Sequence, residues 1–184
     1  MSNWKYNLQE KIVFLKLKSG DSDAFSFFYD QYVTRIYRFV FIKVSNKQVA
    51  EDLTQEIFLK VWQHLVDKKD IQNFQAFIFR VARNSIIDYY RRAYRQELPL
   101  DYVDETKHEA LIDDKTENLD KSLDSEKLLK QLKSLKAEYQ EVLLLRYVED
   151  MSIEDIASIL QKDKNNVRVL IHRATLKLKD LANK

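Results

Sequence analysis

The stretch DAFSFFYDQYVTRIYRFV, residues 23–40, repeats apolar side chains every three or four positions. The repeating residues are Phe25, Phe28, Tyr32, Ile36, Phe39 and Val40. This spacing puts them on one side of a helix, because an α-helix completes a turn in about 3.6 residues. The stretch therefore predicts a helix over about 22–44 with one buried face.

Similar patterns predict further helices on both sides of this one, at 4–18, 47–66, 73–96, 125–135, 138–148, 152–160 and 164–182. The whole chain has one glycine, Gly20, and one proline, Pro99. Sheets need these residues in turns and bulges, so we expect an all-α fold. Ser45 with Gln48, and Ser152 with Asp155, predict capping boxes. Asp163 predicts the N-cap of the last helix.

Composition also narrows the function. The absence of cysteine rules out disulfides, thiolate zinc sites and a cysteine nucleophile, and fits a cytoplasmic protein. The three histidines are far apart and glycines are too few for a phosphate-binding loop, so we expect no metal, no cofactor and no small-molecule substrate. No carboxylate pair lies where its pKa would rise to a catalytic value, which predicts a protein that is not an enzyme. No apolar run is long enough for membrane insertion.

The net charge of +2 conceals three zones. Residues 1–96 have a balance of +6, residues 97–124 of −7 and residues 125–184 of +3. The middle zone contains the proline, lacks phenylalanine and tryptophan, and has no helical period, so it is typical of a linker. We therefore expect two helical domains, 1–96 and 125–184, joined by an acidic linker. That linker is either a solvated loop or a tether that mimics nucleic acid or screens a basic channel.

The last two predicted helices have the pattern of a helix-turn-helix. The outer face of the second helix has Asn165, Arg168, Val169, His172 and Arg173. In the major groove of DNA, arginine reads guanine and an apolar group meets the thymine methyl. The alternative is that these side chains form an ordinary solvated face.

The helix at 73–96 is the most basic segment. One face has Arg80, Arg83, Asn84, Asp88, Arg91 and Arg95, and arginines provide sequence-independent affinity for phosphates. The preceding loop, 67–74, ends in Phe74, whose ring can stack on an unpaired base. The same pattern is equally compatible with binding to RNA, with binding to a membrane surface, and with no partner.

The helix at 47–66 has a face of a different kind. Asp52, Gln55, Glu56 and Leu59 lie together on its outer side, so an exposed apolar residue has an acidic and amide rim. Such a face fits protein docking better than DNA, because the apolar residue provides burial and the rim provides orientation. Ordinary solvent exposure is the alternative.

These helices together resemble a known family. AEDLTQEIFLKVW (50–62) resembles region 2.2, the core-binding helix, of the extracytoplasmic-function sigma factors of bacterial RNA polymerase. Residues 23–40 resemble region 2.1, and FQAFIFRVARNSIIDYYRR (74–92) resembles regions 2.3 and 2.4. YQEVLLLRYVEDMSIEDIASIL (139–160) followed by VRVLIHRA (167–174) resembles region 4.

The resemblance implies a sigma factor that binds core polymerase and directs promoter binding, promoter melting and transcription initiation. It implies that Asp52, Gln55 and Glu56 contact the β′ clamp helices. It also implies that loop 67–74 with Asn84 holds a flipped minus-ten base, while Arg80, Arg83, Arg91 and Arg92 hold phosphates. The second domain would bind the β flap and read the minus-35 element through Arg168, Val169, His172 and Arg173. An anti-sigma factor would be a further partner.

The chain departs from the family pattern at Gln161, where glycine is usual in the turn. Two other functions stay open: a helix-turn-helix repressor or activator that works without polymerase, and a sigma-like regulator that binds polymerase without starting transcripts. The docking face on helix 47–66 separates the first of these from a sigma factor, because a repressor has no use for it.

Overall fold

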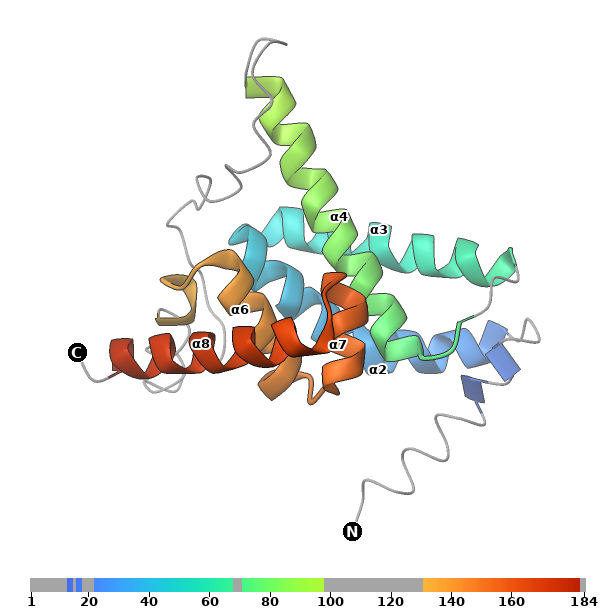
Figure 1. Cartoon of the computed structure of the whole chain (residues 1–184). Helices are drawn as coiled ribbons and strands as arrows, with labels where there is room; N and C mark the ends of the chain where they lie inside the picture. Colours follow the sequence, from blue (N-terminus) through green and yellow to red (C-terminus); the bar gives the residue numbers. More distant parts are fainter. Residues whose placement is uncertain (1–12, 15, 18–21, 68–70, 98–130, 183–184) are drawn as a thin grey trace.

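The computed structural model describes residues 13–14, 16–17, 22–67, 71–97 and 131–182 (Figure 1). Its elements are α2 (Ser22–Val44), α3 (Lys47–Val66), α4 (Phe74–Glu97), α6 (Ala137–Leu143), the π-helical turn η1 (Leu144–Val148), α7 (Ile153–Leu160) and α8 (Lys164–Ala182). None of the described residues lies in a strand, and the predicted all-α fold is confirmed. No helix in this part of the chain is both long and apolar enough to cross a membrane.

The predicted helices at 22–44, 47–66 and 164–182 are confirmed at both ends. The predicted helix at 138–148 is instead α6 followed by the wider π-helical turn η1. Of the segments predicted at 4–18 and 125–135, residues 13–14, 16–17 and 131–133 are helical. Residues 134–135 form a turn and a bend, so the second of these helices ends two residues earlier than predicted, and the others lie outside the described residues. The acidic linker at 97–124 also lies outside them, except that Glu97 ends α4.

Aromatic side chains form the centre of the first half, residues 13–97. Phe28 and Phe74 have ring centroids 4.3 Å apart, and Tyr32 and Phe14 lie edge-on to Phe74 at 5.4 and 6.1 Å. Five of the six residues in the stripe predicted on residues 23–40 are buried, with Phe28 and Ile36 fully inaccessible, and Phe25 is partly buried. These contacts join α2 to the start of α4, and α3 packs on both of them.

Aliphatic side chains form the centre of the second half, residues 131–182. Leu145, Ile156, Ile159 and Val167 are completely buried, and α8 packs on both α6 and α7. The buried residues of the two halves join in one hydrophobic cluster, because α4 packs against α7. In Figure 1 the C-terminal end of α4 projects beyond this body, and α8 lies along its other side.

The helix caps agree with the sequence in the second half but not in the first. Ser152 Oγ accepts from the Asp155 amide at 3.1 Å, and Asp163 accepts from the Asn166 amide at 2.8 Å, as predicted. The capping box predicted at Ser45 is wrong, because Asn46 is the N-cap of α3 and accepts from the Val49 amide. Ser45 has φ 53° and is buried, so its side chain does not cap α3.

Candidate binding surfaces

The predicted docking face lies on α3, and most of it is open to solvent. Asp52 and Gln55 are exposed, and Leu59 has 69% of its surface accessible. Glu56 is only partly exposed, because its carboxylate pairs with Lys60 at 2.6 Å and with Arg92 of α4 at 3.6 Å. The hydrogen bond from Lys60 lowers the pKa of Glu56. This face therefore offers a large apolar side chain beside fixed negative charge.

An apolar groove between α2 and α3 adjoins this face. It is a hollow of about 600 Å³ lined by Phe25, Ser26, Tyr29, Gln55, Phe58, Leu59 and Trp62. Tyr29 and Gln55 also line a second hollow of about 350 Å³ further along the same two helices. The sequence interpretation did not include α2 in this surface. The exposed aromatic Tyr29, which stands outside the buried stripe, was the available signal.

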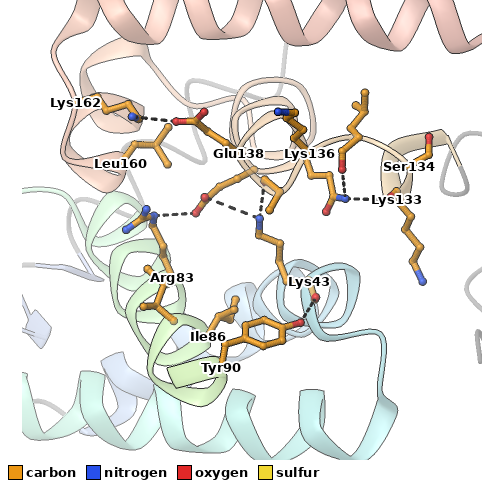
Figure 2. A pocket seen from close by; sticks show the side chains of 15 residues that line it. Lys43, Arg83, Ile86, Tyr90, Lys133, Ser134, Lys136, Glu138, Leu160 and Lys162 are labelled. Atoms are coloured by element: carbon orange, nitrogen blue, oxygen red, sulfur yellow. Dashed lines mark hydrogen bonds and ion pairs between the residues drawn. The ribbon is translucent and has the colours of Figure 1, made fainter. Parts of the chain in front are cut away.

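The basic face of α4 is exposed only in part. Arg80, Asn84, Arg91 and Arg92 are exposed, and Arg91 pairs with Asp88 at 2.8 Å. Arg83 differs from them, because its Nε lies 3.0 Å from Oε1 of the buried Glu141 in α6 (Figure 2). This contact is an ion pair without the alignment of a hydrogen bond. The structure thus holds one arginine of the predicted DNA-binding set against the second half.

Phe74 was predicted to stack on an unpaired base, but the structure places it in the aromatic core. It is the first residue of α4 and only 4% exposed, because its ring packs against Phe28 and Tyr32. A ring that fills the core has no free face for a base, so the stacking role does not fit this structure. The rest of the predicted base pocket, loop 67–74, is described only at residue 67 and residues 71–74. Within it, Asn73 caps α4 by accepting from the Ala76 amide at 3.1 Å.

The helix-turn-helix pattern is seen in α7, a tight turn and α8. Gln161 ends α7 in the left-handed conformation, with φ 54° and ψ 43°, which is the conformation that favours glycine. Asp163 then caps α8. Five predicted residues lie together on the exposed face of α8, and they are Asn165, Arg168, Val169, His172 and Arg173. The Asn165 side chain accepts from Arg168 at 2.9 Å.

The inner side of α8 explains why this face points outward. Val167 and Ala174 are fully buried and Leu170 is 9% exposed, so one side of the helix is fixed on α6 and α7. Val169 stands on the opposite side with 46% of its surface accessible. This surface therefore combines the positive charge of its arginines with the exposed apolar side chain of Val169.

Comparison with known protein families matches residues 28–96 to Sigma-70 region 2 and residues 125–178 to Sigma-70, region 4. The RNA polymerase sigma factor YlaC of Bacillus subtilis (strain 168) is 29% identical over 157 residues, which cover 85% of this chain and 91% of that protein. The ECF RNA polymerase sigma factor SigW of the same strain is 29% identical over 170 residues, 86% of this chain and 88% of SigW.

A solved structure has the same fold. The sigma factor RpoE from Bartonella quintana, crystallised with the anti-sigma factor NepR, matches with a TM-score of 0.72 at 23% identity. The match covers 86% of this chain and 96% of that one.

Proposed function

The chain belongs to the extracytoplasmic-function sigma factors of bacterial RNA polymerase, and we propose that three of its helix faces divide the work of such a factor. As a sigma factor it directs promoter-specific initiation of transcription. The proposed division gives polymerase docking to α3, the minus-ten element to α4 and the minus-35 element to α8. Each face binds a partner and catalyses no reaction. The protein would do this in the cytoplasm, where polymerase works. The family also makes an anti-sigma factor a candidate partner.

The α3 face is proposed to dock on the β′ clamp helices. Leu59 would enter the partner surface, while Asp52 and Gln55 orient it from the rim. The groove beside Tyr29 and Trp62 extends this surface onto α2. The observation that carries the proposal is the exposure of Leu59 beside this groove, because nothing in the described residues covers it.

The α4 and α8 faces are proposed to bind DNA in different ways. On α4, Arg80, Arg83, Arg91 and Arg92 would hold phosphates of the melted minus-ten region, with Asn84 at the flipped base. On α8, Arg168 and its neighbours would read base edges of the minus-35 element in the major groove. The second unit, 125–184, would also bind the β flap, and residues 97–124 would connect it to the first unit, 1–96.

Docking is tested by co-elution of the purified chain with core polymerase. Leu59→Ala should weaken the complex about tenfold or more, because its large apolar side chain would be buried near the centre of the interface, where a few residues carry most of the binding energy. Asp52→Ala and Glu56→Ala should weaken it less. Asp180→Ala, an exposed carboxylate on α8, is the matched control and should not change it.

The same co-elution experiment distinguishes a sigma factor from the two alternative functions, a repressor or activator without polymerase and a sigma-like regulator. A repressor would not co-elute with polymerase, and a sigma-like regulator would co-elute but yield no promoter-dependent transcript in a reconstituted assay. If the complex forms equally well with all four variants, the α3 face is not the docking surface.

A further inference from the structure

A cavity lies between the first and second halves of the chain. Its volume is about 580 Å³, which is within the usual range of small-molecule sites in proteins. Residues of α2 and α4 line one side of it, and the other side is lined by residues 133–138, 140–141, Leu160 and Lys162 (Figure 2). Of the residues assigned above to polymerase or DNA, only Arg83 is in this lining.

The apolar part of the lining is mostly aliphatic. It consists of Ile86, Ile87, Tyr90, Leu135, Ala137 and Leu160. In Figure 2, Ile86 and Tyr90 of α4 lie across the cavity from Leu160 of α7. The Tyr90 hydroxyl already donates to the Lys43 carbonyl at 2.7 Å, so this residue offers its ring and not its polar end. Such walls favour a ligand with an aliphatic body, because the removal of apolar surface from water drives binding.

Positive charge dominates the polar part of the lining. The charged residues there are the cations Lys43, Arg83, Lys133, Lys136 and Lys162 and the carboxylates Glu138 and Glu141. Glu138 is already paired with Lys162 at 2.9 Å. Five cations against two carboxylates leave a net charge of +3 around the cavity. A cavity lined by an excess of one charge concentrates ligands of the opposite charge, so this one favours an anion.

Two largely buried cations of this lining share one carboxylate. Arg83 Nε lies 3.0 Å from Glu141 Oε1, and Lys43 Nζ lies 3.9 Å from Glu141 Oε2 (Figure 2). Arg83 Nε and Glu141 Oε1 are both buried, and neither makes an aligned hydrogen bond to a described residue. Lys43 Nζ also donates to the Ala137 carbonyl at 2.8 Å, a neutral group that does not balance its charge.

The environment of Lys43 indicates the same shortage of negative charge. Burial lowers the pKa of Lys43, Glu141 opposes this shift and Arg83 adds to it. Two buried cations with one carboxylate lack one negative charge, and an anionic headgroup in the cavity would supply it. The oxygen atoms of such a headgroup would also accept the hydrogen bond that Arg83 Nε does not make.

We propose that this cavity binds a small amphipathic anion, a molecule with an aliphatic body and one carboxylate or phosphate headgroup. The body would lie along Ile86 and Leu160, and the headgroup would meet Lys43 and Arg83, with Lys136 at the rim. The lining comes from both halves, so only the folded chain has the complete site. Binding of this ligand to the free chain does not depend on the proposed function.

Calorimetric titration of the full chain with decanoate tests the site. Decanoate has an aliphatic body and a carboxylate, decanol has the same body without the charge, and acetate has the charge without the body. Below the concentration at which decanoate forms micelles, it should bind at one site per chain. It should bind about tenfold more tightly than decanol, because hydrogen bonds to charged groups are the strong ones. Acetate should show no binding, and decyl phosphate should compete with decanoate.

A variant that fills the cavity separates this site from binding elsewhere on the surface. Ile87→Trp places a larger side chain in the lining and should remove decanoate binding. Val81→Trp is the matched control, because Val81 is an equally half-buried residue of α4 outside the lining, and it should not change binding. Decanoate should also raise the unfolding temperature of the parent chain and of Val81→Trp, but not that of Ile87→Trp.

Lysine variants test the headgroup. Lys43→Gln should weaken decanoate binding about tenfold, because it removes a buried cation. Lys47→Gln, at the exposed start of α3, removes the same charge outside the cavity and should have no effect. Lys136→Gln removes an exposed cation of the rim and should weaken binding about twofold. It completes the test if Ile87→Trp or Lys43→Gln does not fold.

Equal affinities for decanoate and decanol would overturn the proposal, because the cations would then have no role. The absence of decanoate binding would overturn it as well, and so would binding that Ile87→Trp and the lysine variants leave unchanged. None of these results affects the proposed function, since docking on core polymerase and promoter-dependent transcription are measured without any of these probes.

Discussion

The two helices proposed to bind DNA, α4 and α8, have similar amphipathic patterns and different surroundings. Each has arginines on one face and apolar residues on the other. On α8 the predicted residues are all exposed, and the ion pair at its start, between Lys164 and Glu154, stays within the second half. On α4, Arg83 is tied to Glu141 and Arg92 to Glu56, so two cations already have partners on other helices.

This difference teaches that the charge pattern of a helix does not by itself show which charges are available. The α8 face is exposed because its helix lies on the outside of the body (Figure 1). The α4 helix lies between its own half and α7, so its cations also serve the packing of the chain.

The strongest way to break the comparison is to truncate an apolar residue near the start of each helix. Phe74→Ala should lower the free energy of unfolding by about 3–5 kcal/mol, because the ring fills the aromatic core. Val169→Ala should change it by less than about 0.5 kcal/mol, because its side chain is at the surface. Urea denaturation measures both. Near-equal losses of unfolding free energy would contradict the difference in burial between Phe74 and Val169.

A smaller effect separates base reading from phosphate contact in the polymerase complex. Arg168→Ala should weaken promoter binding by about 1–3 kcal/mol, only where the preferred upstream base is present. Arg91→Ala should weaken binding on every sequence and flatten the salt dependence by about one unit of slope. Titrations of both variants at several salt concentrations, on matched and altered promoters, check this. An equal loss on every promoter for both variants would refute the division.

A glycine in the turn before α8 should stabilise the folded chain. Gln161→Gly should raise the free energy of unfolding by about 0.5–1 kcal/mol, because glycine has no β-carbon to resist the left-handed conformation. Ser158→Gly inside α7 is the control and should lower stability by about 0.5 kcal/mol, since glycine has a lower helix propensity than serine. Thermal unfolding of both variants distinguishes a turn effect from a general effect of glycine.

The smallest expected effect concerns Glu56, at the junction of the docking and DNA-facing surfaces. Its pKa lies below the ordinary value of 4.5, mainly through the hydrogen bond from Lys60. Lys60→Met should therefore raise the pKa of Glu56, and Arg92→Met should raise it less; NMR titration of the carboxyl carbon measures both. A lowered pKa in the folded chain gives stability above the unfolded value, which is lost as the pH falls through the folded value. Because the carboxylate is over a third exposed, this contribution is small.

Local sequence signals predicted most of the helices. The apolar stripes fixed α2, α3 and α8 to their observed ends, and Ser152 and Asp163 cap where predicted. The error at Ser45 arose because two adjacent residues both make good caps. Only the positive φ of Ser45, imposed by the tight connection between α2 and α3, selects Asn46.

The candidate sites were predictable where they depend on one helix alone. The α8 face and the exposed Leu59 follow from helical projection, and the structure places them as expected. Phe74 was misplaced because an aromatic residue at a helix start looks the same in a base pocket and in a core. The groove on α2 and the partners of Arg83 depend on residues distant in sequence, for which helical periodicity has no signal.

The sequence by itself determined the helices, their buried sides and the family. Periodicity and capping are properties of neighbouring residues, so they can be read without the fold. Only the tertiary structure decided which charges are free, because burial and ion pairing depend on what packs against each helix. The placement of Glu141 beside Arg83, 58 positions apart, is what turns a basic helix face into a partly withheld one.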